Sequence, residues 1–366
     1  MSLIQNPILR GFNADPSIIR VEDTYYIANS TFEWFPGVRL HESKDLKNWN
    51  LLPSPLSTTT LLDMKGNPSS GGIWAPALSW ADGQFWLVYT DVKVTEGAFK
   101  DMTNYLTTAK DIRGPWSDPI KLNGVGFDAS LFHDDDGRKY IVQQTWDHRE
   151  YHHPFDGITL TELDTNTLKL MPETARTIYR GTAVALVEGP HLYKLNGYYY
   201  LFAAQGGTVF THQEVVARSK TLEADSFETE PGDVFLTNVD TPDSYIQKQG
   251  HGALVSTPEG EWYYASLCAP AVESPGGIHL RPARLVNSRP GNRDPESILG
   301  TMRAGRVLKA VTAGKPSSKG RKTPSSPKAP AIIASRMTLP RQRSTRTGIP
   351  CGCRLRPKWA PPATAN

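Results

Sequence analysis

Five side chains suited to proton transfer or sugar contact stand at one shared position in a repeated sequence pattern. Asp15, Asp128 and Glu188 each lie nine residues before a residue of a tight-turn sequence, and Trp74 and His251 have the same offset. When carboxyl groups face one pocket, one can take a proton from water while another protonates a leaving group. Glycosidic bond cleavage needs this arrangement. The pattern therefore indicates hydrolysis of a glycoside, provided that the fold brings these side chains together.

The elements that must position these side chains are predicted to be β-strands. Short aromatic and β-branched runs recur between turns rich in Gly, Asn and Asp, and no helical period of useful length is present. Five of the runs follow a tight-turn sequence: 25–27, 85–89, 140–142, 198–202 and 262–264. The first 267 residues are therefore predicted to be all-β.

The five units form an internal repeat, with spacings of 59, 54, 60 and 63 residues between the residues at the shared offset. Repeats of this length that hold four strands are typical of propeller blades. Equivalent strand ends converge on the axis of a propeller, so the five residues are expected to form a ring around one pocket. The sequence predicts a five-bladed β-propeller.

The chain divides into two unlike parts, which its net charge of +3 over 366 residues conceals. Residues 1–267 hold 21 Lys and Arg against 34 Asp and Glu, whereas residues 268–366 hold 19 against 3. The average charge is therefore no argument for nucleic-acid binding. We expect residues 1–267 to form the propeller, with an incomplete fifth blade. We expect residues 268–366 to form a disordered low-complexity tail rich in Pro, Arg and Ser.

Other features exclude several classes of protein. No stretch approaches the length of a membrane span, and the N-terminus resembles no secretory signal, so a cytoplasmic location is predicted. The three cysteines all lie in the second part, which excludes a disulfide framework in the first. His148, His152 and His153 match no strong zinc signature, and loop stabilisation is the favoured role. We predict no cofactor and no essential metal.

Segment 13–17, Asn-Ala-Asp-Pro-Ser, resembles the start of the β-xylosidase branch of glycoside hydrolase family 43. Further segments resemble that branch in unbroken order as far as about residue 267: 30–37, 71–76, 89–93, 126–132, 146–149, 188–191, 206–208 and 250–252. The resemblance implies a five-bladed β-propeller that hydrolyses terminal β-xylosides or α-L-arabinofuranosides with inversion. It implies that Asp15 is the general base, that Glu188 is the general acid, and that Asp128 orients the acid and raises its pKa.

The resemblance also implies the residues that surround the sugar. Phe32, Trp74 and Ala75 match the wall of the pocket, and Thr208 and His251 match its floor. Three of these five residues have a plainer interpretation as well. The two aromatic residues could belong to the core, and the histidine could be structural.

The predicted substrate is a xylo-oligosaccharide or an arabinoside, with no nucleic-acid or membrane partner and with the oligomeric state left open. The alternative is a catalytically inactive propeller that binds sugars or serves as a scaffold, because the end of blade five, a pocket arginine and a capping domain are not recognisable. Since family resemblance stops inside a blade, we expect residues from about 268 onward to be an out-of-frame or mis-spliced reading.

Overall fold

The computed structural model describes residues 4, 6–96, 99–229, 234–274, 277–280 and 303–310, and side chains as far as residue 269. Apart from one 3-10 turn, η1 (Pro172–Thr174), the regular elements in these ranges are strands. No helix in this part of the chain could cross a membrane. The predicted all-β class is therefore confirmed.

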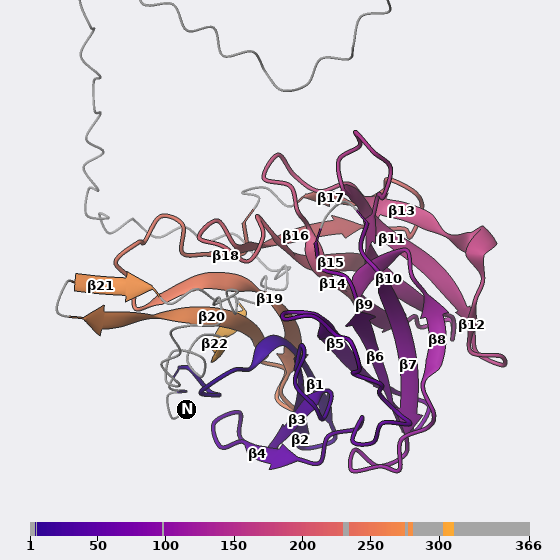
Figure 1. Cartoon of the computed structure of the whole chain (residues 1–366), viewed down its shortest axis with the longest axis horizontal. Helices are drawn as coiled ribbons and strands as arrows, with labels where there is room; N and C mark the ends of the chain where they lie inside the picture. The colour runs from indigo at the N-terminus through magenta and orange to yellow at the C-terminus, as the bar shows by residue number, and fades with distance from the viewer. Residues whose placement is uncertain are drawn as a thin grey trace, which may run out of the picture. The chain divides into compact units, whose positions relative to one another are not determined.

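The strands form five antiparallel sheets that follow one another along the chain (Figure 1). The first sheet contains β1 (Ala14–Val21), β2 (Thr24–Ser30), β3 (Arg39–Ser43) and β4 (Asn50–Leu52). The second contains β5 (Gly72–Ala81), β6 (Gln84–Val92), β7 (Met102–Ala109) and β8 (Ile120–Asn123). The third contains β9 (Gly126–His133), β10 (Lys139–Trp146), β11 (Phe155–Asp164) and β12 (Lys169–Leu170), and β13 (Arg176–Tyr179) pairs with β11.

The last two sheets each carry a strand that pairs away from the main order. The fourth contains β14 (Glu188–Leu195), β15 (Tyr198–Gln205), β16 (Gln213–Ser219) and β17 (Glu228–Thr229), and β18 (Leu236–Thr237) pairs with β16. The fifth contains β19 (Ile246–Ser256), β20 (Trp262–Ser274) and β21 (Gly277–Leu280), and β22 (Arg303–Ala310) pairs with β20.

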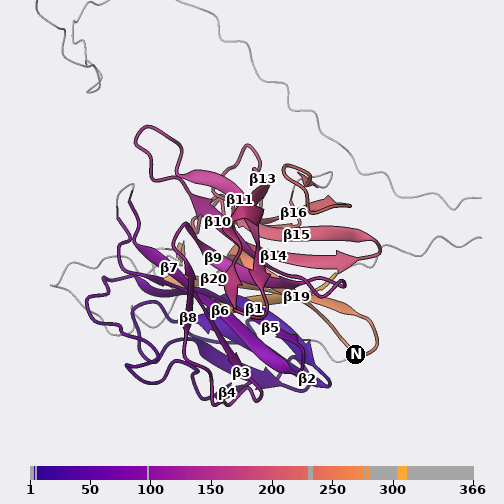
Figure 2. The same cartoon turned by 90° about the vertical axis from the view of Figure 1, so that its right-hand side faces the viewer.

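The first strands of the sheets lie innermost and contact one another in turn (Figure 2). β1 contacts β5, β5 contacts β9, β9 contacts β14, and β14 contacts β19, which also contacts β1. This arrangement is that of a propeller, as the repeat predicts. The count of five complete blades stays a prediction, because the side chains of β21 and β22 lie outside the described residues.

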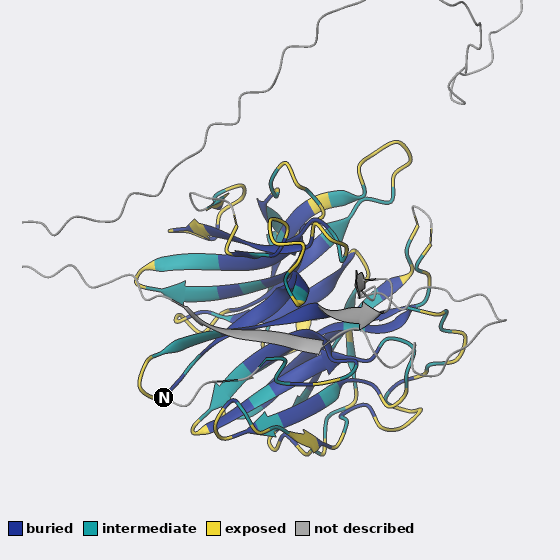
Figure 3. Cartoon of the chain, turned by 90° about the vertical axis from the view of Figure 1, so that its left-hand side faces the viewer, coloured by how far each residue is buried: buried dark blue, intermediate teal, exposed yellow. Residues whose placement is uncertain are grey.

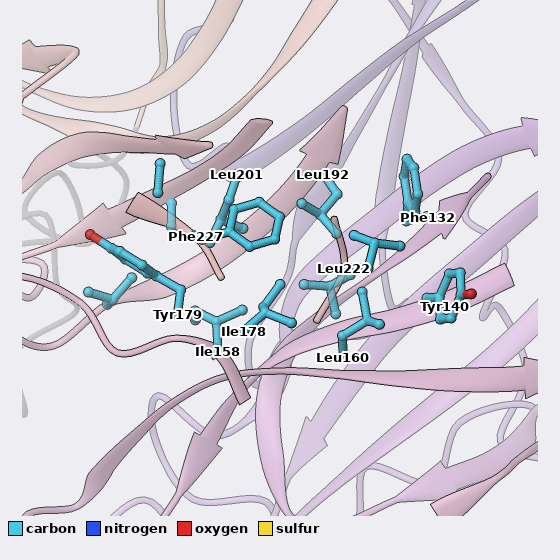
Figure 4. Close-up of a cluster of buried hydrophobic side chains, with 14 of the residues drawn as sticks. Phe132, Tyr140, Ile158, Leu160, Ile178, Tyr179, Leu192, Leu201, Leu222 and Phe227 are labelled. Atoms are coloured by element: carbon cyan, nitrogen blue, oxygen red, sulfur yellow. The ribbon is translucent and has the colours of Figure 1, made fainter. Parts of the chain in front are cut away.

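Apolar clusters lie between neighbouring sheets, and burial follows the strands while the loops are exposed (Figure 3). The largest cluster joins the third and fourth sheets, where Phe132 and Leu160 meet Leu192 and Leu201 (Figure 4). Further clusters join the first sheet to the second, the second to the third, the fourth to the fifth and the fifth to the first. Because each buried aliphatic or aromatic side chain contributes about 1.5–3 kcal/mol, these clusters hold the inner strands in fixed relative positions.

Regular structure continues beyond residue 267, while the predicted division of the chain into two domains at that boundary stays a prediction. β20 runs on to Ser274, and β21 and β22 lie inside the part predicted to be a disordered tail. Cys268 and Ala269 are fully buried, so the strand pairs and packs past the point at which the sequence composition changes. The rest of that predicted tail, 275–276, 281–302 and 311–366, lies outside the described residues.

Candidate active site

One cavity of about 260 Å³ opens where the inner strands meet, and it collects nearly all the predicted site residues. Its lining includes seven of the eight predicted residues: Asp15, Phe32, Trp74, Asp128, Glu188, Thr208 and His251. Ala75 is not among the lining residues. It is buried, and it lies in β5 directly after Trp74. The fold therefore brings seven of the eight predicted residues to one cavity, and Ala75 is the one residue placed differently, while their roles stay a prediction.

Irregular pairing at the cavity end of each first strand places these side chains. β1 loses register between Ala14 and Ser17, so Asp15 and Pro16 lie opposite a single residue of β2. Equivalent register shifts occur in the other four first strands, at Trp74–Ala77, Phe127–Ser130, Glu188–His191 and Gly250–Gly252. A β-bulge of this kind redirects a side chain without ending the strand.

The bulges show that the shared sequence offset is not strictly a shared structural position. Asp15, Asp128 and His251 lie inside their bulges, whereas Trp74 and Glu188 are the residues just before theirs. Counting back from the hairpin misses this difference of one residue, since pairing with the neighbouring strand decides where a bulge falls. All five side chains nevertheless reach the cavity.

The backbone is strained at the same places. Asp15, Asp128 and His251 have φ values of 49°, 53° and 48°, in the left-handed region that residues with a side chain rarely occupy. In the fourth sheet the left-handed position falls on Gly189, directly after Glu188, with φ 61°. Strain of this kind persists only where the surrounding structure enforces it, and it gathers at functional sites.

Asp15 lines the cavity and is held by two neighbouring side chains. The Ser30 hydroxyl donates a hydrogen bond to Asp15 Oδ2 at 2.6 Å, and His251 Nδ1 lies 3.4 Å from Asp15 Oδ1. Burial raises the pKa of Asp15 to about 6, while the Ser30 hydrogen bond and nearby His212 act in the opposite direction. This carboxyl group is therefore ionised above about pH 6 and ready to accept a proton.

Asp128 and Glu188 form the second acidic group of the cavity. Burial raises the pKa of Asp128 well above its usual range, and repulsion from Glu188 and then from Asp15 adds to the rise. The Asp128 N–H donates to Thr90 Oγ1 at 3.2 Å, which ties the bulge to β6. The raised pKa that the sequence predicts for Glu188 stays a prediction, while burial of Asp128 and repulsion from Glu188 together raise the pKa of Asp128.

Aromatic rings form the walls of the cavity. Trp74 lies between Phe32 and Phe127, with ring centroids 6.4 and 5.1 Å away, and its Nε1 donates to the Ser70 carbonyl at 2.8 Å. Sequence reasoning missed several lining residues: Phe12, Ser70, Lys100, Phe127, Trp146 and Val209. Phe127 and Trp146 lie in segments that carry the family resemblance, so that signal was available. Lys100 and Val209 come from loops outside the repeat.

His251 lines the cavity and is neutral near pH 7. Burial lowers its pKa to about 4, so its contact with Asp15 is between a carboxylate and an uncharged ring. Among the described residues, no group of three or more His, Cys, Asp or Glu is placed to hold a metal ion. His152 Nδ1 lies 3.3 Å from Asp147, and His148 contacts the Phe99 ring, in keeping with loop stabilisation.

Comparisons with known proteins place the chain in a family. Residues 4–282 match the model for glycosyl hydrolases family 43. The chain is 53% identical over 264 residues to a beta-xylosidase of Bacillus subtilis, and the aligned part covers 72% of this chain and 49% of that protein. It is 54% identical over 267 residues to xylosidase/arabinosidase 43B of Humicola insolens, and the aligned part covers 73% of this chain and 49% of that protein.

A solved structure agrees with these relatives. The crystal structure of a xylan beta-1,4-xylosidase from Bacillus halodurans has a TM-score of 0.71 and 49% identity, over 80% of this chain and 61% of that one. The chain spans about half the length of the curated relatives that it matches. A family model that covers most of the chain, high identity and a shared fold agree: the chain belongs to glycosyl hydrolases family 43.

Proposed function

We propose that the protein is a glycosidase that removes terminal β-D-xylosyl or α-L-arabinofuranosyl residues from xylan-derived oligosaccharides with inversion. The observation that carries the proposal is one small aromatic-walled cavity lined by Asp15, Asp128 and Glu188. The names of the relatives, beta-xylosidase and xylosidase/arabinosidase, indicate the substrate class. Binding of a sugar ring against aromatic walls suits a cavity of this size.

In the proposed mechanism, Asp15 takes a proton from the attacking water. It is ionised above about pH 6, and the Ser30 hydrogen bond fixes its orientation. Glu188 gives a proton to the leaving oxygen, and Asp128 beside it orients that acid. Because burial and repulsion from Glu188 raise the pKa of Asp128, the pair keeps a proton to higher pH than an exposed carboxyl group does. Inverting enzymes keep base and acid about 6.5–9.5 Å apart to admit the water.

The proposal is tested with an aryl β-xyloside and an aryl α-L-arabinofuranoside as substrates. We expect release of sugar from at least one of them, with the inverted anomer appearing first by NMR. Loss of general acid or base catalysis costs about 10²–10⁴-fold, so Asp15→Asn and Glu188→Gln should each lower kcat/KM at least that far. Wild-type rates in both variants would show that the catalytic residues are assigned wrongly. Xylobiose binding by calorimetry with no product would contradict the proposed activity and favour a sugar-binding propeller.

We further propose that the fifth sheet is the fifth blade of the propeller. The cluster that joins it to the first sheet, in which Ile18 and Ile27 meet Ala253 and Val255, supports this. Amide exchange as slow in β19 and the paired part of β20 as in β9 and β10 is the expected result. Rapid exchange throughout β19 would show that the fifth sheet is not a stable blade.

A further inference from the structure

Two buried side chains contact the backbone of β19 near His251. One is Glu214 of β16, and the other is His212, which lies directly before β16. His212 and Glu214 are two positions apart in an extended segment, so their side chains share one face. The His251 N–H donates to Glu214 Oε2 at 2.9 Å, and His212 Nδ1 lies 3.0 Å from the Lys248 carbonyl oxygen. Since a carbonyl only accepts, His212 Nδ1 carries the hydrogen.

The backbone of β19 needs such partners because it is twice out of register. Its pairing with β20 shifts between Gln247 and Gly250 and again between Gly250 and Gly252. Lys248 and His251 both have left-handed φ values, 57° and 48°. A bulge removes backbone groups from the ladder, and a buried backbone group without a partner is costly. His212 supplies a donor for one of these groups, and Glu214 supplies an acceptor for the other.

The two side chains hold this backbone from inside the protein. Both are completely buried, and Gly250 is close enough to His212 that a Cβ added there would lie 2.8 Å from the ring. Burial raises the pKa of Glu214 to about 8 and lowers that of His212 to about 4, so both are uncharged near pH 7. The Tyr264 hydroxyl lies near the same Glu214 carboxyl group and acts on its pKa.

His251 in turn contacts the bulges that carry two of the predicted catalytic carboxyl groups. Its Nδ1 lies 3.4 Å from Asp15 Oδ1 in the first sheet. On another side its ring lies against Gly189, where a Cβ would come within 2.5 Å of ring atoms, directly after Glu188 in the fourth sheet. A shift of the His251 backbone therefore disturbs the surroundings of both Asp15 and Glu188.

We propose that His212 and Glu214 are positioning residues that fix the double bulge of β19 and, through His251, set the orientation of Asp15. This inference rests on the proposed function for its catalytic meaning, but its structural part stands by itself. The groups that face Asp15 are Ser30, His251, His212 and Asp128. Glu214 is connected to Asp15 through His251, whose N–H it binds and whose ring lies against Asp15.

The test compares two substitutions at one buried position in the full chain. Glu214→Gln keeps a carbonyl oxygen that accepts the His251 N–H, whereas Glu214→Leu keeps the volume and removes the acceptor. Val216→Ala is the matched control, because Val216 lies two residues further along the same face of β16 and packs in the apolar cluster between the fourth and fifth sheets. It removes buried volume without touching the β19 bulges.

We expect Glu214→Leu to lower kcat/KM about 10²-fold, as small displacements of a reacting group do, and to move the acid limb of the pH profile. Glu214→Gln should restore both the rate and the profile, and Val216→Ala should leave the profile unchanged. An unaltered rate and profile in Glu214→Leu would overturn the proposal, and so would equal damage in the Leu and Gln variants.

A second readout does not depend on activity. Exchange of the His251 amide hydrogen, followed by NMR, should become at least about tenfold faster in Glu214→Leu and stay slow in Glu214→Gln and Val216→Ala. If the unaltered protein hydrolyses neither substrate, the proposed function fails, while this measurement still decides whether Glu214 holds the bulge. Equal exchange in all variants would overturn the proposal whatever the activity.

Discussion

The two ends of the innermost strands differ in nearly every physical respect. At the hairpin end, β1 pairs with β2 in unbroken register from Ser17 to Val21, and the adjoining Asp23–Lys44 ion pair is largely exposed. At the cavity end, the same strand carries a bulge, a left-handed residue and a buried carboxyl group at Asp15. The contrast teaches that regular ladders and apolar clusters stabilise the propeller, and that this stability offsets the unfavourable burial and strain at the cavity.

The largest test of this contrast compares two glycines of the fourth sheet. Gly189→Ala should lower kcat/KM by about 10²-fold or more, because its Cβ would meet the His251 ring and because φ is 61°. Gly197→Ala, at the hairpin end with φ 78° and open space around it, should cost only about 1–2 kcal/mol of stability. Kinetics and thermal unfolding of both variants decide this. Equal activity in the two would remove the distinction between the ends.

The next test uses two tryptophans of β5. Trp74→Ala should lower kcat/KM about tenfold, the equivalent of about 1.4 kcal/mol, chiefly through KM, because Trp74 forms the wall of the cavity. Trp80 lies six residues further along the same strand, is 37% exposed and packs edge-on against Phe85. Trp80→Ala should leave KM unchanged. A rise in KM with Trp80→Ala, or none with Trp74→Ala, would contradict the placement of the sugar.

A smaller effect is expected on the pH dependence. kcat/KM should fall below about pH 6 as Asp15 takes up a proton, since only the ionised form can act as the base. The Ser30 hydroxyl stabilises that ionised form, so Ser30→Ala should move this limb to higher pH by up to about one unit. Ser43→Ala removes a comparable hydrogen bond to Asp45, at the surface, and should not move the limb. Movement to lower pH in Ser30→Ala would contradict this account.

The smallest effect is predicted at the hairpin end of the first sheet. Asp23→Asn breaks the 2.6 Å ion pair with Lys44, whose two side chains are 74% and 66% exposed. Exposed pairs contribute little, so Tm and kcat/KM should both stay within experimental error. A clear loss of either would show that the hairpin end also matters for the site.

The ring of carboxyl, indole and imidazole side chains around the cavity can be predicted from the sequence, because these residues recur at one position of the repeat. Asp15, Asp128 and His251 recur at one offset, and equivalent strand ends meet in a propeller. The bulges could not be predicted, since a register shift depends on the partner strand as much as on the strand itself. For that reason Ala75 lies inside its bulge but does not line the cavity, whereas Trp74 does.

Other residues of the site escaped prediction for different reasons. Phe12 and Lys100 reach the cavity from segments outside the repeat, where no periodic signal exists. Glu214 leaves one trace in the sequence, a charged residue directly before the short apolar run 215–217, but its contact with His251 joins two sheets and depends on tertiary structure. The change in composition after residue 267 does not mark the end of regular structure, because strand pairing in β20 continues as far as Ser274.

The recurrence of a bulge at the same end of all five sheets has a consequence for how such a protein can change. In each repeat the bulge turns one residue toward the axis. Each repeat therefore has one position at which a substitution can bring a new side chain to the cavity. Acids, an indole and an imidazole now occupy these positions. Libraries confined to a few codons at these bulges would therefore explore new specificities while leaving the scaffold intact, and each accepted change would need no insertion, deletion or new loop.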